Sequence, residues 1–436
     1  MPTSAVISAL ARSLLAGEPI VEDVHARAVQ TLGRRWCWLR PLARRFVEDV
    51  AGRTRPRHRD VVQFLREDSG FGQAAAKYRD EISISKWIGE PQRMLPVAAA
   101  QAWQLPAIET VGELADWLCL RIGELEWYAD LKGLLHRHPN PKLQHYHYVI
   151  APKRSGGFRL LECPKANLKA LQRRILSGIL DRIPAHPAAH GFVKGRSIAT
   201  FAAPHAGQHV LLRLDLQDFF PSFPAARVAA LFRTIGYPES VADLLGGICT
   251  NAAPVNIWSS HAADRDTRML YARPHLPQGA PTSPALANLT AYRLDCRLSG
   301  LAKSAEAVYT RYADDLAFSG GEAFERAAVR FSIHAAAIAL EEGFAVNHRK
   351  TRIMRQGVRQ QLAGVVVNQK PNLRRGELEL LEAILTNCVR LGPAAQNRAR
   401  LPNFRAHLEG RIGFVAMINP IQGQRLGALF HAIEWK

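Results

Sequence analysis

The sequence predicts an α+β protein whose short strands are concentrated in the middle of the chain, between helical regions at both ends. Residues 209–216 and 308–319 are rich in the β-branched, aromatic and other apolar residues typical of strands. Residues 24–50 and 374–436 instead place apolar residues at near-helical spacing. Because 436 residues are too many for one simple core, we expect roughly two to four subdomains.

The charge balance indicates a polyanionic partner. The chain has 57 Lys and Arg against 38 Asp and Glu, a formal net charge of +19, and an apolar content of 47% that is typical of a globular protein. Lys and Arg gain affinity for nucleic acids by releasing counterions from the phosphate backbone. A membrane is the alternative partner, but the sequence has no apolar run of about 18 residues and no continuous basic amphipathic helix. We therefore expect a nucleic-acid partner and no membrane.

The cysteines and the N-terminus predict a cytoplasmic location. The six cysteines include no C-x-x-C pair and are interpreted as reduced core thiols of an intracellular protein. Residues 1–17 are mildly apolar but contain Arg12 and lack a basic leader, so no signal peptide is predicted.

The first region, residues 1–105, is predicted to be a basic helical extension. Its tryptophans are interpreted as core or docking residues rather than as platforms for stacked bases; they are Trp36, Trp38, Trp87 and Trp103. The basic run at residues 53–59 is either a solvated loop or a loop that contacts phosphates, and the sequence does not distinguish the two.

An amphipathic helix over residues 110–135 is followed by a predicted hairpin over residues 145–161. Gly156-Gly157 allows the tight turn, and Lys153 and Arg159 flank it. Such a basic hairpin suits a triphosphate, because Lys offers a point charge and Arg a planar fork. An ordinary exposed hairpin is the alternative.

A nearly continuous apolar strand over residues 209–214 delivers Asp215 at its end. Burying a carboxylate costs free energy unless the group is paired or binds a metal. Asp215 is therefore a candidate catalytic and metal-ligating residue. Asp218 is instead a candidate cap for a helix that begins near Phe223.

A loop rich in Pro, Gly and Ser leads into a helix near Ser283-Pro284. A loop of this kind allows its backbone, or the Gln278 amide, to lie against a flat base. A plain connection between a loop and a helix would not need the Gln278-Gly279 pair.

The segment 308–319 predicts a tight hairpin that presents Asp314 and Asp315 at its tip. Two adjacent carboxylates repel each other, so they are stable mainly when a divalent cation, an Arg or a Lys compensates them. Taken alone, the pair is weak evidence for a functional site, since Asp favours turns and a solvated turn can contain two Asp. The third carboxylate, Asp215, favours a metal site.

The remaining segments are predicted from their periodicity. A helix over residues 322–342 ends at Gly343, as a C-cap would. Residues 344–352 form a basic strand-like piece, residues 361–368 one short strand, and residues 374–436 a basic helical subdomain.

Taken together and in order, these segments resemble the reverse transcriptase family, specifically its bacterial retron and group II intron type, over roughly residues 110–370. The matching segments are the hairpin with Lys153, Gly156-Gly157 and Arg159, residues 215–220, Gln278-Gly279 with Ser283-Pro284, Tyr312-Ala313-Asp314-Asp315, residues 343–351, and Leu362-Ala363-Gly364. Tyr-x-Asp-Asp alone is modest evidence, whereas six motifs in the expected order are strong evidence.

The resemblance implies a right-hand polymerase fold, with fingers, a palm built on an antiparallel sheet, and a helical thumb. The expected ranges are 1–105 for the helical N-terminal extension, 106–209 for the fingers, 210–368 for the palm with inserted fingers elements, and 369–436 for the thumb.

The resemblance also implies the chemistry. Phosphoryl transfer to a nucleotide uses two Mg²⁺ ions, or Mn²⁺ in their place. Hard oxygen ligands suit these ions, so Asp215, Asp314 and Asp315 are the expected metal ligands and catalytic residues. Lys350 is a candidate proton donor to pyrophosphate.

The substrate-binding residues implied by the resemblance are Lys153, Arg159, Asp218, Phe219, Phe220, Gln278 and Gly279. The two basic residues would hold the triphosphate, with help from backbone amides at residues 218–219. Phe220 would block a 2′-hydroxyl and so favour deoxynucleotides, and Gln278 would touch the incoming nucleotide.

The subgroup is indicated by smaller motifs. Residues 190–193 and 196–198 look retron-like. However, the retron pattern has Asn in place of Phe201 and Val-Thr-Gly in place of Leu362-Ala363-Gly364, and these departures argue against the branched RNA–DNA product of retrons. We therefore expect an antiphage-defence reverse transcriptase related to retrons.

The expected function is that of an RNA-directed DNA polymerase, a nucleotidyltransferase that copies a cognate structured non-coding RNA into DNA from deoxynucleotide triphosphates. The basic N-terminal region and thumb would bind the RNA. Two alternatives stay open: template-independent or protein-primed synthesis at the same site, and a non-catalytic RNA-binding scaffold. The three carboxylates and Phe220 argue against a scaffold, which would need none of them. A protein effector and self-association are the partner classes left open.

Overall fold

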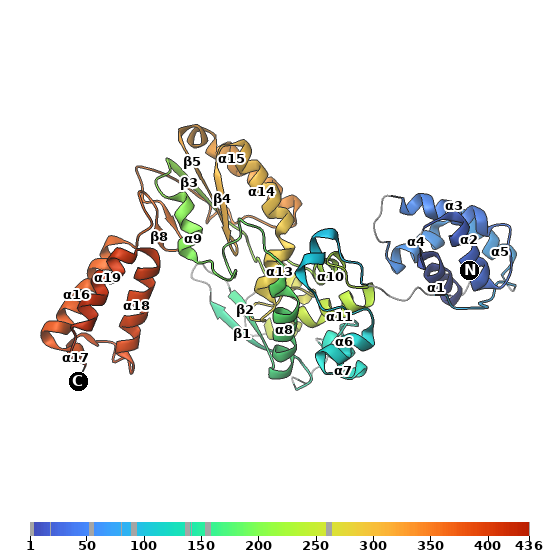
Figure 1. Cartoon of the computed structure of the whole chain (residues 1–436), viewed down its shortest axis with the longest axis horizontal. Helices are drawn as coiled ribbons and strands as arrows, with labels where there is room; N and C mark the ends of the chain where they lie inside the picture. Colours follow the sequence, from blue (N-terminus) through green and yellow to red (C-terminus); the bar gives the residue numbers. More distant parts are fainter. Residues whose placement is uncertain are drawn as a thin grey trace. The chain divides into compact units, whose positions relative to one another are not determined.

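The computed structural model describes residues 4–17, 19–51, 56–79, 81–88, 94–135, 140, 142–152, 158–258 and 264–435. The chain divides into two compact units, Met1–Leu95 and Pro96–Lys436, which are described separately (Figure 1). None of the helices formed by the described residues is long and apolar enough to span a membrane.

The first unit is helical, as its sequence predicts. Its helices are α1 (Ser4–Leu15), α2 (Val21–Leu32), α3 (Leu39–Val50), α4 (His58–Glu67) and α5 (Ser69–Lys77). Asp68 caps the start of α5 by accepting a hydrogen bond from the Phe71 backbone amide at 2.6 Å. Trp36 is buried in the core, whereas Trp87 is exposed. Residues 53–55 of the predicted basic run lie outside the described residues.

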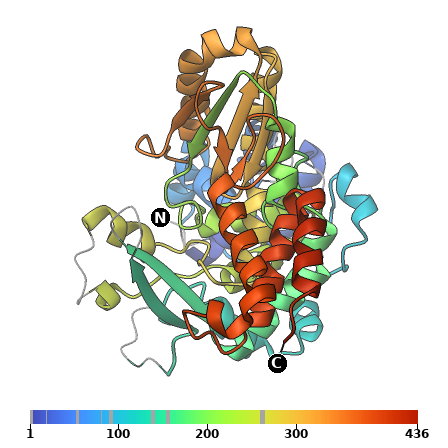
Figure 2. The ribbon, with the colours of Figure 1, turned by 90° about the vertical axis from the view of Figure 1, so that its left-hand side faces the viewer.

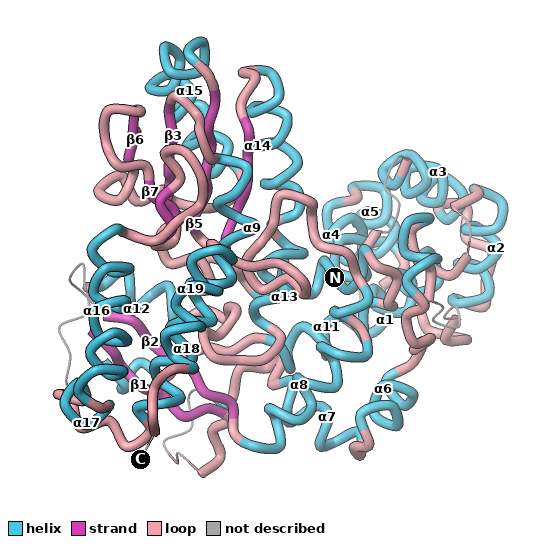
Figure 3. Tube along the Cα trace, turned by 60° about the vertical axis from the view of Figure 1, so that its left-hand side comes forward, coloured by secondary structure: helices cyan, strands magenta, loops and turns pink. Residues whose placement is uncertain are grey.

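The second unit contains a two-stranded hairpin and helices that come before and after it in the chain. These elements are η1 (Ala98–Trp103), α6 (Val111–Leu118), α7 (Ile122–Ala129), α8 (Ala166–Gly178), η3 (Leu180–Arg182), α10 (Ala225–Thr234), α11 (Glu239–Cys249), η5 (Val255–Trp258), α12 (Arg265–Ala272) and α13 (Ser283–Thr290) (Figure 3). The single helix predicted over residues 110–135 is wrong: Cys119 adopts a left-handed conformation at φ 58° and separates α6 from α7.

The hairpin joins β1 (Tyr146–Pro152) and β2 (Phe158–Pro164) in antiparallel register, as predicted. Leu160 is fully buried against Trp258 and Tyr271, whereas Val149 is exposed. The Gln172 amide donates to the Tyr146 hydroxyl and to a backbone carbonyl of α11, both at 2.9 Å. These bonds fasten the hairpin to the helices.

A four-stranded antiparallel sheet forms the centre of the second unit. Its order is β4–β5–β3–β6, with β3 (Val210–Asp215), β4 (Val308–Tyr312), β5 (Asp315–Gly320) and β6 (Arg352–Arg355). One face is covered by α14 (Tyr292–Ser304) and α15 (Glu322–Glu341), where Phe318 packs on Phe331 (Figure 1). The helix predicted over residues 322–342 is confirmed, and Gly343 takes the expected left-handed conformation at φ 86°.

The opposite face of the sheet packs against α9 (Ile198–Ala202), η4 (Ala203–His205) and the C-terminal helices. Leu211 and Ala317 of the sheet share one core with Phe201 and with Leu385. The C-terminal helices are α16 (Arg375–Leu391), α17 (Pro393–Gln396), α18 (Phe404–Ile418) and α19 (Pro420–His431). Figure 2 shows them in red, with the sheet above them.

Two strand predictions near the C-terminal helices are wrong. Residues 361–368 form a small hairpin of β7 (Gln361–Leu362) and β8 (Val365–Val366), because Ala363 and Gly364 turn at φ 45° and 91°. Residues 344–351 are loop and turn with one bridge from Val346 to Leu216, and the strand begins only at Arg352. The prediction of core thiols holds only for Cys249 and Cys388, since the other four free cysteines are exposed.

Candidate active site

The strand pair β3–β5 brings two of the predicted carboxylates face to face. Asp215 pairs directly with Asp315, and the Leu216 backbone amide donates to the Asp314 carbonyl at 2.9 Å. This bond marks the Asp215–Asp315 pair as a non-hydrogen-bonded pair, in which Cα atoms lie about 4.5 Å apart and side chains approach closely. Asp215 is buried, and its partner is partly buried.

Asp314 lies in the turn that joins β4 to β5. The predicted tight hairpin is confirmed, because Tyr312 pairs with Asp315 and leaves only residues 313–314 between the strands. Ala313 has φ 55°, the left-handed conformation that such a turn needs. The structure therefore brings Asp215, Asp314 and Asp315 together at one end of the sheet.

Two cations compensate the carboxylates that face each other. The Lys350 Nζ lies 3.0 Å from both Asp215 carboxylate oxygens. The Arg213 guanidinium donates twice to Asp315 Oδ1, at 2.9 and 2.6 Å. Lys350 reaches the site because the loop after α15 docks on β3, where the Asn347 amide donates to the Asp215 carbonyl at 2.8 Å.

The third carboxyl group, that of Asp314, is unfavourable in its ionised form. Burial, followed by the charges of Asp315 and Asp215, raises the pKa of Asp314 from 3.8 to about 6. Burial also raises the pKa of Asp315, while its ion pair with Arg213 opposes the rise. Within the described ranges, no group of three or more His, Cys, Asp or Glu side chains is arranged to hold a metal ion.

A buried polar network lies beneath the turn, and sequence reasoning missed it. The fully buried Arg311 guanidinium donates to both Asp295 carboxylate oxygens at 2.7 and 2.6 Å, to Asn288 Oδ1 at 3.0 Å, and to the Ala313 carbonyl at 3.2 Å. The Tyr309 hydroxyl donates to Asp295 at 2.8 Å. The sequence signal for this network was Arg311, which stands in the middle of a strand, because a charge that is buried there requires a partner.

The loop after Asp215 contains one aromatic side chain that lies in the core and one that is partly accessible. Phe219 is buried between Phe223 and Phe344, at ring distances of 5.0 and 5.9 Å. Phe220 is partly buried. The alternative of Asp218 as a helix cap is wrong, since the residue at the N-cap of α10 is Pro224.

The Gln278-Gly279 loop lies against β2. The backbone amide of Glu162 donates to the Gln278 carbonyl at 2.9 Å, and a Cβ on Gly279 would lie 2.8 Å from the Glu162 carbonyl oxygen. Gly279 also has φ 134°, so glycine is required there. The buried Glu162 side chain accepts from Asn251 at 2.7 Å and pairs with His275 at 2.9 Å, a second network that the sequence did not reveal. As predicted, Ser283 begins a helix, α13.

The predicted triphosphate hairpin is described only in part. Arg159 is exposed on β2, opposite Ala151 of β1. Lys153 and Gly156-Gly157 lie outside the described residues. The structure therefore shows that Arg159 lies on the hairpin, and the predicted role of Lys153 stays untested.

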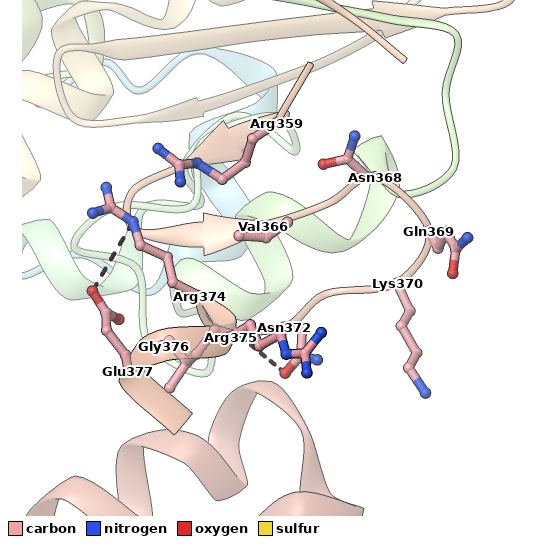
Figure 4. Close-up of a pocket in the computed structure, with 11 residues that line it drawn as sticks. Arg359, Val366, Asn368, Gln369, Lys370, Asn372, Arg374, Arg375, Gly376 and Glu377 are labelled. Carbon is pink, nitrogen blue, oxygen red and sulfur yellow. Dashed lines mark hydrogen bonds and ion pairs between the residues drawn. The ribbon is translucent and has the colours of Figure 1, made fainter. Parts of the chain in front are cut away.

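A basic pocket of about 720 Å³ lies where the β7–β8 hairpin meets the first C-terminal helix (Figure 4). Its lining residues are Arg359, Val366, Asn368, Gln369, Lys370, Asn372, Leu373, Arg374, Arg375, Gly376 and Glu377. Figure 4 shows Arg359 and Arg374 extending in the same direction. The four cations against one carboxylate make the pocket suitable for an anion.

Comparisons with known proteins agree with this geometry. Residues 151–372 match the family model described as reverse transcriptase (RNA-dependent DNA polymerase). The chain is 43% identical over 340 residues to the retron Mx65 reverse transcriptase of Myxococcus xanthus, covering 76% of this chain and 74% of the relative. It is 36% identical over 352 residues to the retron Mx162 enzyme of the same organism, covering 77% and 69%. It is also 36% identical over 212 residues to the retron Ec86 enzyme of Escherichia coli, covering 49% and 59%. The chain therefore belongs to the reverse transcriptase family, and within it to the bacterial retron type.

Proposed function

We propose that this retron-type RNA-directed DNA polymerase carries out nucleotidyl transfer at Asp215, Asp314 and Asp315. The observation that carries the proposal is the pairing of Asp215 with Asp315 across β3–β5, with Asp314 in the adjoining turn. The four-stranded sheet would be the palm, the β1–β2 hairpin part of the fingers, and the C-terminal helices the thumb.

The three carboxylates suit Mg²⁺, because hard oxygen ligands are what this ion prefers. When bound, two Mg²⁺ ions supply positive charge that activates the primer hydroxyl and neutralises the leaving pyrophosphate. The raised pKa of Asp314 supports this fit, since a carboxyl that is costly to ionise among other carboxylates gains most from a nearby cation. Lys350 and Arg213 hold Asp215 and Asp315 when no metal is bound.

The remaining residues bind and select the nucleotide. Arg159, with Lys153, holds the triphosphate, assisted by the backbone amides at residues 218–219. Phe220 excludes the 2′-hydroxyl, and its partly buried ring beside the buried Phe219 supports that role. Gln278 touches the incoming nucleotide from a loop that Gly279 fits against β2. Once the Lys350 ammonium group is released from Asp215, it donates a proton to pyrophosphate.

A reverse transcriptase copies an RNA template into DNA from deoxynucleotide triphosphates. We propose the basic pocket, with its three arginines and Lys370, as one contact for the backbone of a cognate non-coding RNA. We further propose a cytoplasmic role in antiphage defence, with a protein effector or a second copy of the chain as partner.

The decisive experiment is to sequence the nucleic acids that co-purify with wild type and with Asp314→Ala/Asp315→Ala. We expect DNA and RNA on the wild type and RNA alone on the variant, because loss of two metal ligands removes several kcal/mol of transition-state stabilisation, roughly 10³-fold or more in rate. Equal DNA on both proteins would refute the polymerase site. DNA without a template among the bound RNAs would favour template-independent synthesis.

A further inference from the structure

Phe192 combines two unusual features. Its side chain is 51% exposed although it is large and apolar. Its backbone has φ 61°, the left-handed region that L-residues other than Asn and Asp rarely occupy. Such a conformation is unfavourable for a residue with a Cβ and persists where the surrounding structure imposes it, often at functional sites.

The backbone around Phe192 is held by the catalytic turn itself. A Cβ on the preceding Gly191 would lie 2.6 Å from the Ala313 backbone nitrogen, so only glycine allows this close approach. The Asn288 amide donates to the Gly191 carbonyl at 2.8 Å, and the His190 backbone amide donates to the Arg311 carbonyl at 2.7 Å. Phe192 is therefore fixed to the residues that position Asp314 and Asp315.

The ring of Phe192 lies near two aromatic residues of the proposed site. Its centroid is 6.1 Å from that of Phe220 and 6.4 Å from that of Tyr312. Asp218, two residues before Phe220, and Ala313, directly after Tyr312, also have left-handed φ of 46° and 55°. Three left-handed residues other than glycine thus surround one place, where strain at a functional site is the expected cause.

We propose that Phe192 is a stacking surface for a nucleobase at the polymerase site. An exposed aromatic face that the backbone holds in one place stacks on any base, because every base presents a π-face. The base belongs either to the incoming nucleotide or to the end of the primer–template duplex. This inference rests on the proposed polymerase function and adds a binding residue to it.

The test compares Phe192→Ala, Phe192→Leu and Phe192→Trp in primer extension on an RNA template. Loss of one base–aromatic stack corresponds to about 10-fold weaker binding. We expect Phe192→Ala and Phe192→Leu to raise the KM for the deoxynucleotide, or the Kd for the primer–template, by about that factor, and Phe192→Trp to retain wild-type values. A change in KM alone assigns the stack to the incoming base, and a change in Kd assigns it to the duplex end.

Tyr292→Ala is the matched control, since Tyr292 is an exposed aromatic residue of the same unit that packs edge-on against His186. It is expected to leave both constants unchanged. Phe192→Leu keeps apolar volume but has no π-face, so wild-type KM and Kd in this variant would overturn the proposal. A wild-type protein that extends no primer would instead refute the proposed function.

Discussion

Two buried ion pairs support the two loops of the proposed site, and they differ in one chemical respect. Arg311 and Asp295 lie beneath the Asp314–Asp315 turn, and His275 and Glu162 lie behind the Gln278-Gly279 loop. The side chains of both pairs are at most 1% exposed. Each pair is linked to its loop by a hydrogen bond to a backbone carbonyl. The Arg311 side chain donates to the Ala313 carbonyl, and the backbone amide of Glu162 donates to the Gln278 carbonyl.

The difference lies in the cation. Arg cannot be deprotonated in a protein, so the support beneath the Asp–Asp turn does not change with pH. His275 can lose its proton. Burial alone would lower the pKa of His275, but its ion pair and hydrogen bond with Glu162 raise the pKa above 6.5. The structure thus gives the Asp314–Asp315 turn, the proposed metal-ligating turn, a permanent anchor, and the Gln278-Gly279 loop, proposed to contact the nucleotide, a titratable one.

Removal of Asp295 tests the permanent anchor and has the largest expected effect on stability. Asp295→Ala leaves the Arg311 guanidinium buried without its carboxylate, so we expect the free energy of unfolding to fall by about 3–5 kcal/mol. Urea denaturation measures the change. Glu379→Ala is the control, because Glu379 pairs with Arg375 on the exposed surface, where solvent screens the interaction and little stability depends on it. Similar losses in both variants would contradict the anchoring role.

Asp314→Asn tests whether the ionised Asp314 carboxylate in the turn destabilises the folded state. A carboxyl whose pKa rises from 3.8 to about 6 on folding destabilises the folded state by up to roughly 3 kcal/mol once it is ionised. The cost is absent below pH 3.8 and complete above pH 6. Without metal, Asp314→Asn should therefore be more stable than wild type at pH 7.5, and the difference should vanish near pH 4.

The matched variant is Asp315→Asn. Burial also raises the pKa of Asp315, but the ion pair with Arg213 opposes the rise, so this variant should be stabilised less than Asp314→Asn. Thermal unfolding in EDTA, repeated with Mg²⁺, measures both variants. We expect Mg²⁺ to stabilise the wild type more than Asp314→Asn. Equal stability of wild type and Asp314→Asn at pH 7.5 would mean that the turn carries no such cost.

The two glycine contacts separate the roles of the two loops. Alanine at Gly191 would clash with the Ala313 backbone of the Asp–Asp turn, and alanine at Gly279 with the Glu162 carbonyl. A displacement of about 1 Å in a catalytic group costs roughly 10²-fold in rate. We expect Gly191→Ala to lower kcat by that factor and Gly279→Ala mainly to raise the KM for the nucleotide.

Gly300→Ala is the control for the glycine variants, because a Cβ there meets open space on α14. Steady-state primer extension gives kcat and KM for all three variants, and circular dichroism checks that they fold. Equal effects on kcat from Gly191→Ala and Gly279→Ala would remove the distinction between the loops.

The sequence predicted the parts of the site that leave a local pattern. Apolar and β-branched runs predicted β3 and the β4–β5 hairpin, and the acids at their ends followed from the same runs. The support beneath them has no local pattern, because Asp295 lies on a helix and meets Arg311 only in the folded chain. The β7–β8 turn was missed for a similar reason: Ala363 has no intrinsic preference for its left-handed conformation.

The titratable anchor gives the smallest expected effect and the most specific one. A His whose pKa is raised on folding stabilises the protein fully below its unfolded pKa of about 6.5, and the contribution is lost as the pH rises through the folded value. The stability difference between wild type and His275→Gln should therefore be largest at pH 6 and should shrink toward pH 9. The difference between wild type and the double variant Arg311→Met/Asp295→Leu, which leaves no carboxylate of this pair buried alone, should stay constant over the same range, because the Arg311 charge is permanent. Urea denaturation at pH 6, 7.5 and 9 measures both differences, and a His275→Gln difference that is independent of pH would show that the two anchors are chemically equivalent.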